Sequence, residues 1–343
     1  MKYEVTIGMP VYKAVDYIER TMESALNQTF ESIEYLVVDD CGNDGTINVV
    51  ERFQNNHPRG KYIRILYNKQ NLGIGRTRNI ILEQAKGEYL YFLDSDDIME
   101  PNAIEKMMSA AHKYQAQVVY GSWIRVDNVH HSPVQYSCYP DLQLLKPDEL
   151  AMYAFKNYSS FQISVCNVLY SHNLILSNHL RFIDTVYWED LAFTYDLVPK
   201  VSRAVLLSDI TYQYLCRSGS LSNYQDREKM NKSEIIKNSL TLDYLKRNSI
   251  ALCGKSYFPY LYYNLETNSF YIICYILKNY KRITPLISDS EMVEILRYPI
   301  SVWKILRFRH RRFFNFIYCA LSHLPLPMSL FVVKFLGKMK KVI

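Results

Sequence analysis

The segment Gly87–Met99, GEYLYFLDSDDIM, joins a short apolar run to a cluster of acids. Residues 89–93 carry no charged side chain, which is typical of a strand buried on both faces of a parallel sheet. Asp94, Asp96 and Asp97 follow at once, and carboxylates so close together repel one another. A divalent cation held by their oxygens would remove this repulsion and usually also holds phosphate oxygens. The segment predicts a metal–diphosphate site or, alternatively, an acidic turn that caps the next helix.

Short apolar runs alternate with helical patterns from Val5 to Tyr120. The expected strands are Val5–Met9, Tyr35–Val38, Ile63–Tyr67, Tyr89–Leu93 and Val118–Tyr120, with helices between them. This order predicts an α/β fold with a mostly parallel, doubly wound sheet and helices on both faces. Right-handed crossovers would bring the loops that follow the strands to one edge of the sheet, where such folds bind ligands.

The second half of the chain is less regular at first and then helical. We expect an irregular flap over Asp127–Pro147 and late strands at Val205–Leu207 and Tyr212–Tyr214. From Glu228 to about Arg282 the pattern is helical. The predicted organisation is an α/β domain over residues 1–225 followed by a helical region over residues 226–343.

Charge is distributed unevenly along the chain, although the net charge is only +6. After Glu294 there is no acidic residue, and nine Lys and Arg residues lie between Ser301 and Ile343. The other 31 basic residues face all 34 acids, so the rest of the chain is slightly negative. Such asymmetry predicts an anionic surface as a partner. Nucleic acid is disfavoured, because no recognition motif accompanies the basic residues and the acidic site would repel a polyanion.

The tail has the composition of a membrane-surface segment. Phe313–Val333 contains no charged residue if His323 is neutral, but Pro325 and Pro327 would break a spanning helix. We expect two short amphipathic helices on an anionic membrane, from about residue 300 to residue 343. The alternative is a helix pair packed on its own domain. Seven scattered cysteines and the lack of a cleavable signal pattern favour a cytoplasmic protein, peripheral on the inner membrane face.

Several motifs in fixed order resemble glycosyltransferase family 2, a family with the GT-A fold, in its bacterial polysaccharide-making branch. The matching stretches are Gly8–Tyr12, Asp39–Thr46, Asn71–Gly73, Arg76–Asn79, Gly87–Leu90, Asp94–Asp97, Glu189–Asp190, and Tyr212–Tyr214 with Arg217 and Ser220–Ser222. Together they span roughly residues 3 to 225 in the family's order. Two departures are Gly42, where the family has Ser, and Cys166–Tyr170, where it often has Trp-Asn-Lys-Leu-Tyr. The second departure means that the acceptor cannot be carried over.

The resemblance implies an inverting transfer from a nucleotide-diphosphate sugar, most simply a UDP-sugar. Asp190 would be the base for the acceptor hydroxyl and Glu189 its catalytic neighbour. The alternative is that the two acids only stabilise the start of a helix at Leu191.

The resemblance also implies Mg²⁺ or Mn²⁺ at the acidic turn. Asp97 is the first expected ligand and Asp96 the second, with Asp96 also a candidate contact of the ribose. Asp94 has a structural role in this interpretation.

The remaining expected contacts hold the nucleotide. Pro10 and Tyr12 would flank the base ring, Tyr12 by stacking, and Asp40 would bind the base by hydrogen bonds. Arg76 would lie near the nucleotide, and the forked guanidinium of Arg217 would clamp the diphosphate. For both arginines the alternative is a solvated surface residue.

The sequence therefore predicts a metal-dependent glycosyltransferase. Its acceptor would be a glycan, most simply a lipid-linked one used to build a surface polysaccharide. One rival is a sugar-phosphate nucleotidyltransferase, although Gly8–Tyr12 lacks the Gly-rich basic loop of such enzymes. The other is a non-catalytic nucleotide-binding member that serves as a membrane-bound assembly partner.

Overall fold

The computed structural model describes residues 3–127, 132–185, 188–216 and 230–342, which fall into two compact units. The sheet unit contains the described residues of 1–150, 162–184 and 193–220, and the helical unit those of 151–161, 185–192 and 221–343. The predicted domain boundary at residues 225–226 lies outside the described residues.

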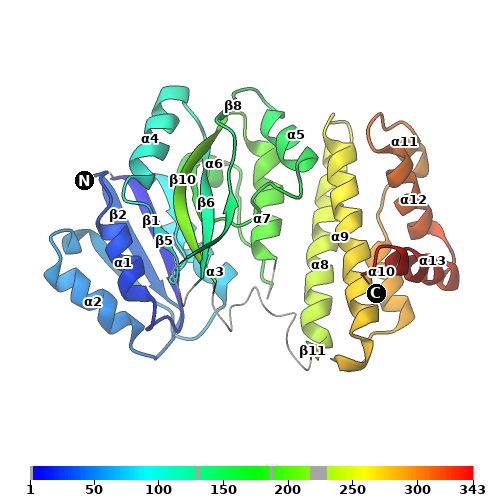
Figure 1. Ribbon diagram of the computed structural model, residues 1–343, viewed down its shortest axis with the longest axis horizontal. Helices are drawn as coiled ribbons and strands as arrows, with labels where there is room; N and C mark the ends of the chain where they lie inside the picture. Colours follow the sequence, from blue (N-terminus) through cyan, green and yellow to red (C-terminus); the bar gives the residue numbers. More distant parts are fainter. Residues whose placement is uncertain (1–2, 128–131, 186–187, 217–229, 343) are drawn as a thin grey trace. The chain divides into compact units, whose positions relative to one another are not determined.

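Four parallel strands form the first half of the sheet, in the order β3-β2-β1-β4. They are β1 (Tyr3–Val11), β2 (Ile33–Asp39), β3 (Ile63–Tyr67) and β4 (Gly87–Phe92). Figure 1 shows β1 and β2 next to each other in this half. In the register, Val11 lies opposite Asp39 and Gly8 lies opposite Phe92, so the three central strands end at the same edge. The predicted parallel arrangement is confirmed.

The second half of the sheet is mixed. It consists of β9 (Val168–Ser171), β6 (Val118–Asp127), β10 (Ala204–Cys216) and β5 (Ile98–Met99), with β7 (Pro133–Ser137) on β6 and β8 (Leu142–Leu144) on β10. Strand β9 runs antiparallel to both β4 and β6, whereas β10 runs parallel to β6. The described part of the expected flap thus contains the short strands β7 and β8. The two late strands that we expected are one strand, β10, with register shifts near Ile210.

Helices cover both faces of the sheet, as predicted. They are α1 (Ile18–Leu26), α2 (Thr46–Asn56), α3 (Ile74–Gln84), α4 (Ala103–Tyr114) and α6 (His172–Ser177). Helices α1 and α2 pack together, and α3 and α6 are joined by a contact of 2.8 Å between His172 Nε2 and the Leu82 carbonyl. Helix α3 approaches β1 so closely that a Cβ on Gly8 would lie 2.3 Å from the Ile81 side chain.

The described C-terminal part is helical, as expected. Its helices are α8 (Lys232–Ser249), α9 (Phe258–Lys278), α10 (Asp289–Leu296), α11 (Val302–Leu306), α12 (Arg312–His323) and α13 (Leu326–Met339), together with parts of α5 (Glu149–Lys156) and α7 (Glu189–Leu197). The tail forms two helices, α12 and α13, because Pro325 and Pro327 start a new helix instead of continuing the old one. Among the described residues, no helix combines the length and the apolar character needed to cross a bilayer.

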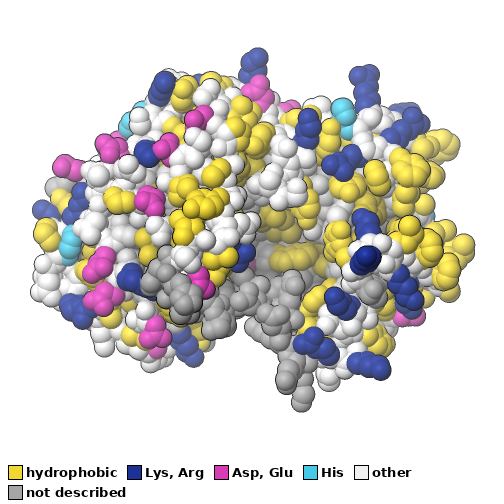
Figure 2. All heavy atoms as spheres, viewed as in Figure 1, with side chains coloured by type: hydrophobic (Ala, Val, Ile, Leu, Met, Phe, Trp, Pro, Cys, Tyr) yellow, Lys and Arg dark blue, Asp and Glu magenta, His cyan; other side chains and the backbone are white. Residues whose placement is uncertain are grey.

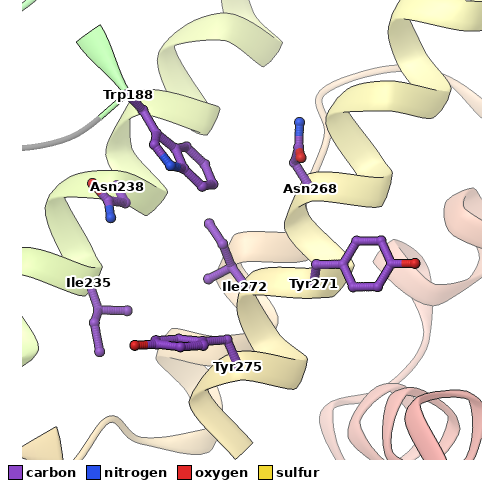
Figure 3. Close-up of a pocket in the computed structure, with 7 residues that line it drawn as sticks. All are labelled: Trp188, Ile235, Asn238, Asn268, Tyr271, Ile272 and Tyr275. Carbon is purple, nitrogen blue, oxygen red and sulfur yellow. The ribbon is translucent and has the colours of Figure 1, made fainter. Parts of the chain in front are cut away.

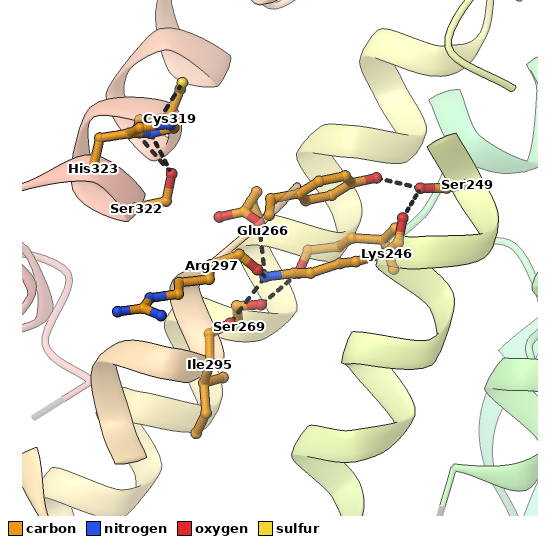
Figure 4. A network of polar contacts seen from close by, with 11 residues as sticks. Lys246, Ser249, Glu266, Ser269, Ile295, Arg297, Cys319, Ser322 and His323 are labelled. Atoms are coloured by element: carbon orange, nitrogen blue, oxygen red, sulfur yellow. Dashed lines mark hydrogen bonds and ion pairs between the residues drawn. The ribbon is translucent and has the colours of Figure 1, made fainter. Parts of the chain in front are cut away.

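A buried ion pair lies at the centre of the helical unit (Figure 4). Lys246 of α8 and Glu266 of α9 are fully enclosed, and the Nζ–Oε1 distance is 2.8 Å. Lys246 Nζ also donates to the carbonyls of Ile295 and Arg297, at 2.9 and 3.2 Å. One ammonium group therefore joins α8, α9 and the C-terminal end of α10.

Candidate active site

The loops that follow the four parallel strands meet at one edge of the sheet. Backbone hydrogen bonds join them: Asp40 N donates to the Val11 carbonyl at 2.8 Å, and Asn68 N to the Asp39 carbonyl at 2.9 Å. Leu93 N likewise donates to the Gly8 carbonyl at 3.1 Å. This edge carries the expected nucleotide contacts at the ends of β1 and β2 together with the acidic turn after β4.

Asp40 fastens one of these loops to another. Its buried carboxylate accepts hydrogen bonds from Asn68 Nδ2 and Leu72 N, both at 2.8 Å, and from Gly73 N at 2.9 Å. Gly73 has φ = 84°, a conformation that residues with a side chain rarely adopt. Asp40 therefore shapes the loop after β3, and its role as a contact of the nucleotide base stays a prediction.

Pro10 and Tyr12 differ in what they present to a ligand. Pro10 is buried within β1, whereas the Tyr12 side chain is 44% exposed just beyond the strand. The Lys13 ammonium lies 5.2 Å from the centre of the Tyr12 ring. A flat, accessible ring next to a cation can stack on a nucleotide base and attract its phosphates.

A buried arginine holds the first acid of the acidic turn. Arg78 of α3 pairs with Asp94 at 3.0 Å, and its guanidinium lies 5.6 Å from the centre of the Phe182 ring. We assigned no role to Arg78 from the sequence, where only its place in the Arg76–Asn79 motif could have drawn attention to it. This ion pair supports the structural role expected for Asp94.

The last acid of the turn is fastened to β10. The Asp97 side chain is 1% exposed, and its oxygens accept hydrogen bonds from the Tyr212 hydroxyl at 2.7 Å and from Leu215 N at 2.9 Å. Burial, together with the nearby Asp96 and Asp94 carboxylates, raises the pKa of Asp97 well above its usual value, although the two hydrogen bonds oppose this. Asp97 thereby links the acidic turn to β10.

Asp96 remains at the surface of the turn and is partly exposed. Within the described parts of the chain, no three His, Cys, Asp or Glu side chains lie close enough together to hold a metal ion by themselves. A cation at this turn would therefore need oxygen ligands from a substrate as well.

The other expected residues lie at several places in the chain. Arg76 is exposed on α3 and pairs with Asp184 at 2.5 Å. Glu189 and Asp190 are the first two residues of α7, where carboxylates are stabilised by the helix dipole. Trp188, just before them, has φ = 69°, so the chain turns sharply into the helix. Arg217 lies outside the described residues.

Comparisons with known proteins agree with this arrangement. The family model described as glycosyl transferase family 2 matches residues 6–175, which include most of β1, the other three parallel strands and the acidic turn. A cholesterol galactosyltransferase of Borreliella burgdorferi is 25% identical over 284 residues, 79% of this chain and 77% of that protein. A chondroitin synthase of Escherichia coli is 38% identical over 109 residues, 32% of this chain but only 15% of that protein.

Solved structures show the same fold. Residues 1–349 of Staphylococcus aureus TarS, in complex with UDP-GlcNAc, align with a TM-score of 0.60 and 20% identity. The alignment covers 90% of this chain and 82% of that one. The family match, together with the ordered motifs, assigns the chain: it belongs to glycosyl transferase family 2 and is a glycosyltransferase.

Proposed function

We propose that the protein transfers a sugar from a UDP-sugar to a hydroxyl group of a glycan acceptor, with inversion at the anomeric carbon. The observation that carries this proposal is the single sheet edge that holds the exposed Tyr12 ring, the loop fastened by Asp40 and the acidic turn. The TarS structure with UDP-GlcNAc and the match to a chondroitin synthase support the donor class and the polysaccharide context.

Asp190 is the proposed base. It takes the proton of the acceptor hydroxyl while that oxygen forms a bond to the anomeric carbon and the bond from this carbon to the diphosphate breaks. Glu189 beside it keeps the local charge negative, and the start of α7 stabilises both ionised carboxylates. Arg76, and Arg217 as predicted from the sequence, would attract the diphosphate.

The acidic turn fits a Mg²⁺ or Mn²⁺ ion that is shared with the donor. Asp96 is partly exposed, whereas Asp97, the first ligand expected from the sequence, already accepts two hydrogen bonds. We therefore place the cation first on Asp96, with Asp97 positioning the turn. The ion would neutralise the negative charge that develops on the leaving diphosphate.

Calorimetric titration with UDP tests the donor site. We expect micromolar binding that needs Mn²⁺ and that falls at least tenfold in Asp96→Asn, because a neutral amide is a poorer ligand for the ion. Asp289→Asn, an exposed acid at the start of α10, is the matched control and should bind as the wild type does. UDP binding that does not depend on Mn²⁺ or on Asp96 would contradict the metal site.

Turnover of Asp190→Asn tests the base. Loss of a general base typically lowers the rate by about 10²- to 10⁴-fold, so we expect transfer to fall by this factor while UDP binding persists. A variant with wild-type turnover would remove Asp190 from the mechanism. Release of UDP, rather than of pyrophosphate from UTP, separates this function from that of a nucleotidyltransferase.

We also propose that the helical unit binds an anionic membrane. Large apolar side chains are exposed on its last helices, namely Trp303, Phe313, Phe331, Phe335 and Met339. Basic side chains lie among them, and Figure 2 shows hydrophobic and basic atoms side by side over this part of the unit. Aromatic side chains and cations together suit the boundary between lipid headgroups and acyl chains.

Sedimentation with vesicles tests the membrane surface. We expect binding to vesicles that contain phosphatidylglycerol, weaker binding to pure phosphatidylcholine, and loss at high salt. Replacing Phe313 and Phe331 by Ser should weaken binding, whereas Tyr136→Ser, an exposed aromatic of the sheet unit, should not. Equal binding to both lipids would contradict the electrostatic part of this proposal.

A further inference from the structure

The helical unit contains a cavity of about 230 Å³ (Figure 3). Figure 3 shows the Trp188 indole projecting into the space between α8 and α9, with Ile272 and Tyr275 on α9. None of the described residues that line the cavity carries a charge. Diphosphate groups are usually bound by cationic side chains, so this lining does not fit the donor. The buried polar contacts around the acidic turn come from the sheet unit instead.

Asn167 lies within a buried polar network of the sheet unit. It directly precedes β9, is only 1% exposed and has no part in the donor contacts described above. Its Oδ1 accepts hydrogen bonds from the Thr211 hydroxyl at 2.6 Å and from the Tyr91 hydroxyl at 3.2 Å. Its Nδ2 donates to the carbonyls of Gly121 and Ser122, at 2.8 and 3.1 Å. One amide therefore joins β4, β6 and β10.

The backbone of Asn167 is as specific as its side chain. Its φ is 58°, in the left-handed region that Asn adopts more readily than most residues with a side chain. The neighbouring strand comes so close that a Cβ on Gly121 would lie 1.9 Å from Thr211 Oγ1 and 3.0 Å from Asn167 Oδ1. A residue held in a sparsely populated conformation by its surroundings points to a function for the group it presents.

Thr211, the partner of this amide, lies in an irregularity of β10. The pairing of β10 with β6 shifts its register between Ile210 and Tyr212, so Thr211 is the extra residue of a β-bulge. A bulge re-aims the side chains beside it. Here the Thr211 hydroxyl is directed to Asn167, while the next side chain, Tyr212, donates to Asp97 at 2.7 Å. The bulge thus connects the buried amide to the last acid of the acidic turn.

The backbone of β10 holds the acidic turn as well. Glu100 N donates to the Thr211 carbonyl at 3.0 Å, and β5, which follows the turn, pairs antiparallel with β10. Leu215 N donates to the Asp97 carboxylate at 2.9 Å. A shift of β10 would therefore move the whole turn, including Asp96, the first ligand proposed for the cation.

We propose that Asn167 is a positioning residue for the metal-dependent donor site. By holding Thr211 it fixes the bulge in β10, and through Tyr212 and Asp97 it sets the place of the acidic turn. Because Asn167 is buried, it acts through these residues and is not itself a ligand. This inference rests on the proposed function, since it takes the acidic turn to hold a cation that is shared with UDP.

Calorimetric titration with UDP at increasing Mn²⁺ concentrations tests this role. Thr211→Val removes the hydroxyl that holds the amide and changes the size of the side chain little. We expect the Mn²⁺ concentration for half-maximal UDP binding to rise about three- to tenfold, the factor that one buried hydrogen bond is worth. Asn167→Gly, which keeps the left-handed backbone, should raise it at least as much. Thr211→Ser keeps the hydroxyl and should need no more Mn²⁺ than the wild type does.

The matched control is Thr267→Val in the helical unit. Its hydroxyl is also buried and donates to the Tyr318 hydroxyl at 3.3 Å. Urea unfolding measures the loss of stability in each variant, and the Mn²⁺ requirement should rise in Thr211→Val but not in Thr267→Val. Equal Mn²⁺ requirements of Thr211→Val and the wild type, or of Thr211→Val and Thr211→Ser, would overturn the role of Asn167 alone. Wild-type UDP binding that does not depend on Mn²⁺ would overturn the proposed metal site together with this inference.

Discussion

Asp97 in the sheet unit and Glu266 in the helical unit are both buried carboxylates, but they are stabilised in different ways. Asp97 in the sheet unit accepts hydrogen bonds from a tyrosine hydroxyl and a backbone N–H. Glu266 in the helical unit lies 2.8 Å from the Lys246 ammonium, and burial raises its pKa while Lys246 opposes the rise. The donors to Asp97 are thus neutral, whereas the partner of Glu266 carries a charge.

These carboxylates differ in whether a charged partner stabilises them. Asp97 and Asp40 use neutral groups to join loops, so the donor edge is shaped without a buried cation at these two acids. In the helical unit one buried ion pair joins three helices, and each charge depends on the other. Removing one member should therefore cost more in the helical unit than removing one hydrogen bond does in the sheet unit.

The largest expected effect is that of Lys246→Met. It leaves Glu266 buried without its cation, which typically costs 3–5 kcal/mol in the free energy of unfolding. Urea unfolding measures the loss. Arg247→Met is the matched control, because Arg247 is the next residue and forms only an exposed pair with Asp243; it should cost less than about 1 kcal/mol. Adding Glu266→Leu to Lys246→Met should recover much of the loss, and a double variant as unstable as Lys246→Met would contradict the pairing.

A smaller effect is expected of Tyr212→Phe in the sheet unit. It removes one donor from Asp97 and keeps the ring in place, which should lower the free energy of unfolding by about 1–3 kcal/mol. Tyr136→Phe, at an exposed tyrosine of the same unit, should change it by less than about 0.5 kcal/mol. If Tyr212→Phe destabilised the protein as much as Lys246→Met does, the contrast between the units would fail.

The sign of the pH dependence sharpens the contrast further. Without Lys246, burial is no longer opposed and the pKa of Glu266 should rise further above its unfolded value. The folded state then holds a proton that the unfolded state releases, so stability is greatest at low pH and falls as pH rises through the window above about 4.3. We expect Lys246→Met to lose up to about 1.4 kcal/mol per pH unit relative to the wild type there. If the free energies of unfolding of Lys246→Met and the wild type differed equally at pH 5 and pH 8, Glu266 would not titrate in this window.

The parallel half of the fold could be predicted closely from the sequence. Buried parallel strands are continuous apolar runs, and β3 spans the residues expected for it. Strand β10 was harder to predict, because the polar pair Ser208-Asp209 interrupts its apolar pattern where the register shifts. The short strands β7 and β8 pair with partners far away in the sequence, and no local pattern indicates such pairing.

For the candidate site, the motifs indicated which side chains share an edge but not what holds them. The spacing of Asp94, Asp96 and Asp97 cannot show that Asp97 faces Tyr212 or that Arg78 is buried against Asp94. These contacts join residues from different elements, so they depend on packing and not on local sequence.

The smallest expected effect concerns an exposed ion pair of the helical unit. The hydrogen bond from Lys232, followed by those from Ser288, lowers the pKa of Glu291 to about 2. A lowered pKa means that the stabilisation is present above the unfolded value of about 4.3 and is lost as pH falls toward 2. Glu291→Gln keeps the capping box of α10 and removes only the charge.

Because both side chains of this pair are partly exposed, solvent screens it and the change should stay below about 1 kcal/mol at pH 7. Urea unfolding of Glu291→Gln and wild type at pH 7 and pH 3 should show a smaller difference in the free energy of unfolding at pH 3. If this difference did not change with pH, Glu291 would act through its cap hydrogen bonds and not through its charge. In that case the charge dependence predicted for this unit would rest on the buried pair of Lys246 with Glu266.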